Sequence, residues 1–120
     1  MVKNVIVADD HPSWREIYVD IVKGAFPDVN VDAVETGSDL VKRVLEGDYS
    51  LVISDNDMEG QGDGLEALRA IRKAGNNVPF YVISGRSIGD EALRLGANGF
   101  YNKALFDSDK VLEDMAQYLK

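Results

Sequence analysis

The chain has 120 residues, of which 45% are hydrophobic and 28% charged, and this composition is typical of one globular domain. Its net charge of -8 argues against a nucleic-acid-binding surface, which would need a basic patch. Because the chain has no cysteine, disulfides, Cys-ligated zinc and thiol chemistry are excluded. No apolar run reaches the length of a bilayer span and no secretory signal opens the chain, so we expect a cytoplasmic protein without membrane insertion.

Predicted strands and helices alternate along the whole chain. Short apolar runs predict strands at residues 4–9, 29–34, 51–54, 80–84 and 98–102. The intervals between them carry apolar residues at helical spacing. We expect the first helix to begin at Pro12, and the second to run from an N-cap at Ser38 to a stop at Gly47. The third and fourth are expected to end at Gly75 and Gly96, and a fifth follows the last strand.

This alternation predicts an α/β fold of the (βα)5 type over a single domain, residues 1–120. Strand–helix–strand units have right-handed crossovers, which place the strands in one doubly wound five-stranded parallel sheet. We find no linker, repeat or low-complexity segment that would divide the chain.

Four of the five predicted strands end in residue types that phosphoryl transfer needs. Asp9 and Asp10 follow the first run, Asp55 the third, Ser84 the fourth and Lys103 the fifth. The carboxyl ends of parallel strands share one edge of the sheet, and ligands bind there in open α/β sheets. Three carboxylates, a hydroxyl and an ammonium suit the binding of a divalent cation and the transfer of a phosphoryl group.

Together these residues resemble the receiver domains of two-component response regulators. The resemblance spans essentially all 120 residues and extends to ETG (35–37), DG (63–64) and GANGF (96–100). It implies a flavodoxin-like sheet with strand order 2-1-3-4-5. It also implies a stand-alone signalling domain, similar to chemotaxis regulators, which catalyses only its own phosphorylation and dephosphorylation and is not otherwise an enzyme.

The resemblance assigns the phosphoacceptor and the metal ligands. Asp55 would take a phosphoryl group from a sensor histidine kinase or a phosphotransfer protein. Asp9, Asp10, Asp55 and the backbone carbonyl of Asp57 would hold Mg²⁺, or Mn²⁺ in its place. The phosphorylated domain would then act on a downstream protein target, with no direct contact to nucleic acid.

The resemblance also assigns residues around the phosphoryl group. Lys103 would pair with one phosphoryl oxygen, and Ser84 would donate a hydrogen bond to another. Ser84 and Phe100 would form the switch that reports phosphorylation. Asp57 and Arg86 would flank the phosphoryl group and tune its lifetime, and we expect their opposite charges to pair across the mouth of the site.

Several positions depart from the family pattern. Glu59 stands where a proline is usual, in a glycine-rich loop that is longer by one residue and that we expect to be mobile. The short interval from Ser84 to Gly96 predicts a short fourth helix. Ala104 replaces the proline after the lysine, so we expect a trans peptide bond there. His11, a lone histidine beside a proline, is expected to face solvent.

Three alternatives remain at this point. Segment 55–66 fits the spacing of a calcium-binding EF-hand loop, although a strand-like run precedes it where an EF-hand needs a helix. Asp55 and Asp57 also mimic the Asp-x-Asp motif of aspartate-nucleophile phosphatases of the haloacid dehalogenase type, which carry it on the first strand. The third alternative is a truncated receiver from a DNA-binding regulator, a class in which DDHP (9–12) is common.

Overall fold

The computed structural model describes residues 2–120. Its strands are β1 (Asn4–Ala8), β2 (Asn30–Val34), β3 (Leu51–Asp55), β4 (Phe80–Ser84) and β5 (Gly99–Asn102). They form one five-stranded sheet in the order β2-β1-β3-β4-β5, and every neighbouring pair is parallel. The predicted fold class and strand order are confirmed.

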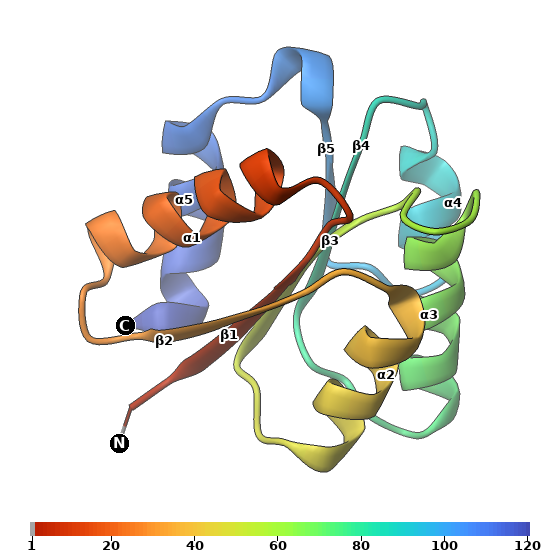
Figure 1. Ribbon diagram of the computed structural model, residues 1–120, viewed down its shortest axis with the longest axis horizontal. Helices are drawn as coiled ribbons and strands as arrows, with labels where there is room; N and C mark the ends of the chain where they lie inside the picture. The colour runs from red at the N-terminus through yellow and green to blue at the C-terminus, as the bar shows by residue number, and fades with distance from the viewer. Residues whose placement is uncertain (1) are drawn as a thin grey trace.

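Helices cover both faces of this sheet, as Figure 1 shows. The helices are α1 (Pro12–Ala25), α2 (Gly37–Glu46), α3 (Asp63–Lys73), α4 (Gly89–Arg94) and α5 (Ser108–Leu119). α1 and α5 lie on one face, and α2, α3 and α4 lie on the other. The chain therefore winds in both directions from β1, which places a crevice at the carboxyl ends of the central strands.

The core consists of one apolar layer on each side of the sheet. Val5 and Val7 of β1 belong to the layer under α1 and α5, whereas Ile6 and Ala8 belong to the layer under α2, α3 and α4. This division follows from the alternation of side chains along a strand. Because β1, β3 and β4 are buried on both faces, they are almost continuously apolar up to the residues at their carboxyl ends.

The predicted N-cap of the second helix is wrong by two residues. Thr36 is the N-cap of α2, and its hydroxyl accepts the N–H of Asp39 at 3.1 Å. Ser38 already lies inside the helix, with its Oγ 3.2 Å from the Thr36 Oγ. A capping residue needs an extended backbone while its side chain reaches the third helical N–H, and Thr36 meets both conditions. The predicted stop at Gly47 is confirmed.

The length of the fourth helix and the peptide bond after Lys103 agree with the predictions from the sequence. α4 has only 6 residues, whereas α1 has 14. Over residues 2–120, no helix combines the length and apolar character that spanning a membrane requires. Every peptide bond in the same range is trans, including the bond between Lys103 and Ala104. Lys103 begins a short 3₁₀ helix, η1 (Lys103–Leu105).

Candidate functional site

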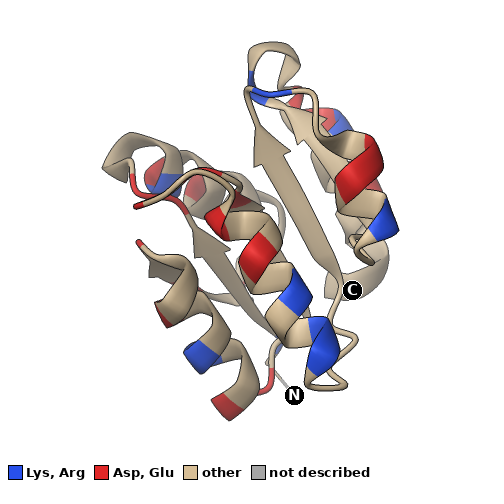
Figure 2. Ribbon diagram, turned by 90° about the vertical axis from the view of Figure 1, so that its right-hand side faces the viewer, with Lys and Arg blue, Asp and Glu red and all other residues tan. Residues whose placement is uncertain are grey.

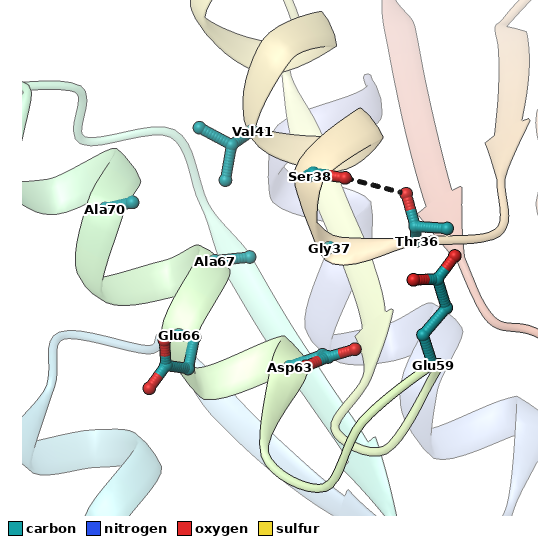
Figure 3. Close-up of a pocket in the computed structure, with 9 residues that line it drawn as sticks. All are labelled: Thr36, Gly37, Ser38, Val41, Glu59, Asp63, Glu66, Ala67 and Ala70. Atoms are coloured by element: carbon teal, nitrogen blue, oxygen red, sulfur yellow. Dashed lines mark hydrogen bonds between the residues drawn. The ribbon is translucent and has the colours of Figure 1, made fainter.

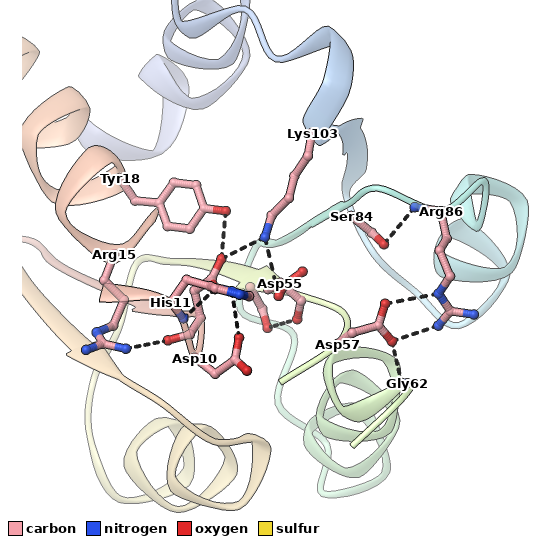
Figure 4. Close-up of polar contacts among 12 residues, drawn as sticks. Asp10, His11, Arg15, Tyr18, Asp55, Asp57, Gly62, Ser84, Arg86 and Lys103 are labelled. Atoms are coloured by element: carbon pink, nitrogen blue, oxygen red, sulfur yellow. Dashed lines mark hydrogen bonds and ion pairs between the residues drawn. The ribbon is translucent and has the colours of Figure 1, made fainter. Parts of the chain in front are cut away.

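The carboxyl edge of the sheet brings the predicted residues together, as Figure 4 shows. Asp9 follows β1 directly, Asp55 ends β3, Ser84 ends β4, and Lys103 follows β5. Asp55 pairs in register with Ile83, so Ser84 lies one residue further along the neighbouring strand. Strand polarity alone therefore gathers residues that are up to 94 positions apart in the chain.

Asp9 is the most enclosed carboxylate of the site. It is fully buried, and each of its oxygens has defined partners. Oδ1 accepts the backbone N–H of His11 at 3.0 Å, while Oδ2 accepts the Tyr18 hydroxyl and the Lys103 ammonium, both at 3.1 Å. A buried charge is tolerated only when it is paired and hydrogen-bonded, and these contacts meet that requirement.

The ammonium group of Lys103 contacts the carboxylates at the ends of β1 and β3. Its Nζ lies 3.1 Å from Asp9 Oδ2 and 3.4 Å from Asp55 Oδ2. The same Nζ lies 4.7 Å from the centroid of the Trp14 ring, a cation–π distance. The Asn102 side chain accepts the N–H of Ala104 at 2.8 Å and so caps η1. Lys103 therefore reaches both carboxylates although the following residue is alanine.

The protonation equilibrium of Asp55 is shifted by its surroundings. Burial and, after it, the charge of Asp9 raise the pKa of Asp55 to about 6, while Lys103 acts in the opposite direction. Asp55 is only 3% exposed, which explains why burial dominates. Burial and Asp9 also raise the pKa of Tyr18, so its hydroxyl stays protonated and donates to Asp9. A perturbed carboxylate in a crevice is typical of a functional site.

The carboxylates fit a divalent cation by the chemistry of their donor atoms. Asp9, Asp10, His11 and Asp55 each offer one ligand atom, and all four atoms lie within 4.8 Å of one another. The Asp10 side chain is 35% exposed, so the cluster is open to solvent on that side. Carboxylate oxygens are the ligands that Mg²⁺ prefers, usually together with several waters.

His11 is largely exposed, as predicted, but it also contacts the carboxylates of the site. Its side chain is 63% exposed, but Nδ1 points back to the cluster, 2.9 Å from Asp10 Oδ1 and 3.2 Å from Asp9 Oδ1. His11 is the N-cap of α1, and its side chain makes no capping hydrogen bond. The imidazole is therefore directed at the carboxylates and not at the helix.

Asp57 and Arg86 form a clasp between the β3–α3 and β4–α4 loops (Figure 4). Arg86 donates from Nε and a terminal nitrogen to the two carboxylate oxygens of Asp57, at 3.0 and 2.8 Å. This pairing is the main reason why the pKa of Asp57 is lowered. The backbone N–H of Arg86 also donates to Ser84 Oγ at 3.1 Å. The expected charge pairing across the mouth of the site is confirmed.

Hydrogen bonds join the start of α3 and the end of the glycine-rich loop before it to Asn56 and Asp57. Gly64 and Leu65 donate their N–H groups to the carbonyl and side-chain oxygens of Asn56, at 2.7 and 3.0 Å. The N–H of Gly62 donates to Asp57 at 2.8 Å. A Cβ on Gly64 would stand 2.2 Å from the carbonyl oxygen of Asp55, so only glycine allows this approach.

Phe100 lies on β5 beside the start of α4. It pairs in register with Val82, two residues before Ser84, so Phe100 and Ser84 occupy the same face of the sheet. The ring is half-buried, and a Cβ on Gly89 would stand 3.1 Å from it. Phe100 thus contacts the first residue of α4.

Two residues of α1 that the sequence did not indicate as site residues hold Asp9. The Tyr18 hydroxyl donates to the Asp9 carboxylate. Arg15 donates to the backbone carbonyl of Asp9 at 2.8 Å and pairs with Glu35 at 3.3 Å. The sequence did offer one indication of this contact, because the hydroxyl of a buried tyrosine usually needs a hydrogen-bond partner.

A second hollow, of about 350 Å³, lies between α2 and α3 and is lined in part by residues of the loops that follow β2 and β3 (Figure 3). Glu59, Asp63 and Glu66 contribute carboxylates to its lining. All nine lining residues are among those described, and none of them is basic or belongs to the strand-end cluster. The hollow therefore lacks the opposing charges that make the strand-end site suited to chemistry.

The structure argues against two alternatives for segment 55–66. An EF-hand loop needs a helix before it, whereas β3 precedes Asp55. The carboxylate of Asp57, which an EF-hand would use as a ligand, is instead taken by Arg86. The Asp-x-Asp motif follows the third strand of the chain, not the first as in the phosphatases considered.

Comparison with known proteins identifies the family. The model of the response regulator receiver domain matches residues 5–116, almost the whole chain. The chain belongs to the response regulator receiver domain family. Receiver domains are signalling modules of two-component systems and interact with histidine kinases or phosphotransfer proteins.

Individual relatives agree with this assignment. The response regulator TrrA from Thermotoga maritima, solved in complex with Mg²⁺ and BeF, is 26% identical with a TM-score of 0.84, over 98% of this chain and 100% of that one. The chemotaxis response regulator CheY4 of Vibrio cholerae is 21% identical with a TM-score of 0.83, over 99% and 100% of the two chains. A glycerol metabolism activator of Pseudomonas putida is 28% identical over 104 residues, 83% of this chain. The chain spans 47% of that relative's length.

Proposed function

We propose that this receiver domain is a phosphoacceptor and that Asp55 carries the phosphoryl group. One observation carries the proposal: the buried Asp55 carboxylate ends β3 with the Lys103 ammonium 3.4 Å away and the Asp9–Asp10 pair beside it. An Asp55 oxygen attacks phosphorus and forms an acyl phosphate, while the bond from phosphorus to the donor breaks. The donor is a sensor histidine kinase or a phosphotransfer protein.

We assign the cation site to Asp9, Asp10, Asp55 and the backbone carbonyl of Asp57, with Mg²⁺ or Mn²⁺ as the cofactor. A bound divalent cation offsets the negative charge of the phosphoryl oxygens, which is the main requirement of phosphoryl transfer. Tyr18 and Lys103 hold the Oδ2 side of Asp9, which leaves Oδ1 facing Asp10 and His11. The similarity to TrrA, solved with Mg²⁺ and BeF, supports Mg²⁺ as the cation.

The remaining residues act on the phosphoryl group once it is on Asp55. Lys103 pairs with one phosphoryl oxygen, and the Ser84 hydroxyl donates to another. Movement of Ser84 toward the phosphoryl group would release its contact with the Arg86 N–H and make room beside Phe100, which lies on the same face of the sheet. Ser84 and Phe100 thereby transmit phosphorylation to a protein-interaction surface and a downstream protein.

Intact-mass spectrometry after incubation with Mg²⁺ and acetyl phosphate tests the proposal. We expect one added phosphoryl group on the wild-type chain and none on Asp55→Asn. Glu59→Gln serves as the matched control, because it alters an exposed carboxylate of the same loop that has no role in the proposed site. Wild-type labelling of Asp55→Asn would show that another residue is the acceptor.

A further inference from the structure

The imidazole of His11 stands where a further ligand of the proposed cation site would stand. Nδ1 lies 2.9 Å from Asp10 Oδ1 and 3.2 Å from Asp9 Oδ1. Two ligands at right angles on an octahedral cation, with bonds of ~2.1 Å, are ~3.0 Å apart. The two distances from Nδ1 to the carboxylate oxygens therefore match the spacing of neighbouring ligands around one ion.

His11 and Lys103 contact different carboxylate oxygens of Asp9. Lys103 contacts Oδ2 of Asp9, whereas the His11 ring and the His11 backbone N–H contact Oδ1. A cation bound between Asp10 and the Oδ1 side of Asp9 would thus meet His11 without displacing Lys103 from Asp9. The His11 side chain is 63% exposed, so its ring can turn toward such an ion without disturbing the core.

We infer that His11 is a nitrogen ligand of this site and makes it selective for borderline divalent cations such as Ni²⁺ and Zn²⁺ over Mg²⁺. Imidazole suits Zn²⁺, Ni²⁺ and Cu²⁺, whereas carboxylate and water suit Mg²⁺ and Mn²⁺. Mg²⁺ keeps several of its waters and gains little from an imidazole. The inference rests on the proposed cation site at Asp9, Asp10 and Asp55, and it adds a ligand that changes the preference among metals.

Isothermal titration of the full chain with Mg²⁺ and with Ni²⁺, at one pH and without a polyhistidine tag, tests the selectivity. We expect His11→Gln to weaken Ni²⁺ binding at least about tenfold and Mg²⁺ binding less than about threefold, since loss of a single supporting group commonly costs about 10–100-fold in metal affinity. Ser13→Ala, an exposed change two residues away, should leave both affinities unaltered.

A spectroscopic measurement identifies the ligand directly. His11 is the only histidine of the chain, so any imidazole signal belongs to it. With Cu²⁺ as the probe, pulsed EPR should detect modulation from the remote imidazole nitrogen in the wild type and none in His11→Gln. Such a signal in the wild type supports the inference, and its absence overturns it.

The two proposals fail in different ways. If His11→Gln binds Ni²⁺ as tightly as the wild type while Asp10→Asn weakens both cations, the inference about His11 is wrong and the carboxylate site stands. If the wild type binds neither Mg²⁺ nor Ni²⁺ at millimolar concentration, the proposed cation site itself is wrong, and the inference falls with it.

Discussion

Asp55 differs from an ordinary surface aspartate because of where β3 ends. Burial is the largest cause of its raised pKa, the charge of Asp9 is second, and Lys103 opposes both. Asp10 is not among these causes, and its side chain is 35% exposed, so water screens its charge. The enclosure of β3 between two helical layers thus sets the acidity of the proposed acceptor.

This shift predicts a pH dependence of stability in the metal-free protein. The pKa of Asp55 rises from 3.8 to about 6 on folding, so the folded state binds more protons between these values. Stability should therefore fall as pH rises through this window, by up to about 3 kcal/mol. Urea denaturation in the presence of EDTA, from pH 4 to 7, measures the fall. Asp55→Asn should flatten the curve, and an equal slope in the variant would contradict the assignment.

We predict that the ion pair between Asp57 and Arg86 lengthens the lifetime of the phosphorylated state. Because the bidentate pair spans the mouth of the site, its loss opens a path for the attacking water. We expect Arg86→Ala to lose its phosphoryl group several times faster than the wild type, measured as decay of the phosphorylated mass. Arg69→Ala, an exposed arginine on α3, is the matched control. An unchanged decay rate in Arg86→Ala would show that the pair does not affect dephosphorylation.

At the scale of elements, the junction between β3 and α3 shapes the site. α3 begins against the backbone of Asp55, and Gly64 is the point of contact. Asn56 receives the N–H groups of Gly64 and Leu65, which satisfies donors that every helix leaves free at its start. The loop that carries Asp57 is therefore held at both ends, which positions Asp57 opposite Arg86.

A pair of glycine substitutions tests this junction. Gly64→Ala would place a Cβ 2.2 Å from the Asp55 carbonyl oxygen, and such overpacking should cost about 1–3 kcal/mol of unfolding free energy. Gly24→Ala, in α1 with nothing within 4 Å of its Cβ, should gain about 0.5–1 kcal/mol. Urea denaturation of both variants measures the difference. Equal stabilities would mean that α3 can move away from Asp55 without cost.

At the scale of the whole molecule, the three helices on one face of the sheet, α2, α3 and α4, have acidic residues in the first turn and basic residues in the last. α3 has Asp63 and Glu66 in its first turn and Arg72 and Lys73 in its last, and α4 repeats this order. Figure 2 shows the basic residues of these helices at the end away from the carboxyl edge of the sheet. The arrangement complements the helix dipoles and concentrates negative charge around the strand ends. A net charge of -8 adds to this field, which favours the approach of a cation.

Mg²⁺ should therefore stabilise the folded chain. A cation that binds only the folded state contributes about 2.7 kcal/mol at one hundred times its dissociation constant. We expect millimolar Mg²⁺ to raise the melting temperature in differential scanning calorimetry, and Asp10→Asn to remove most of that rise. Asp39→Asn, an exposed carboxylate on α2, controls for the general effect of charge. A full Mg²⁺ effect in Asp10→Asn would argue against Asp10 as a ligand.

The sequence by itself determined the elements and the set of residues at the carboxyl edge of the sheet, because both depend on local periodicity and on strand polarity, which a chain carries without reference to distant contacts. The order of the strands was predicted from the resemblance to receiver domains. The short α4 could be predicted from the short interval between Ser84 and Gly96, and the pairing of Asp57 with Arg86 from the resemblance to receiver domains.

Only the tertiary structure decided which neighbours each site residue meets. Tyr18 donates to Asp9, and His11 turns back to Asp9 and Asp10, because α1 packs over the end of β1 at one particular rotation. Thr36 instead of Ser38 caps α2 because the backbone of residue 36 is the one still extended. Such contacts depend on rotamers and on differences of a few tenths of an ångström between packed elements, which residue type and spacing do not encode.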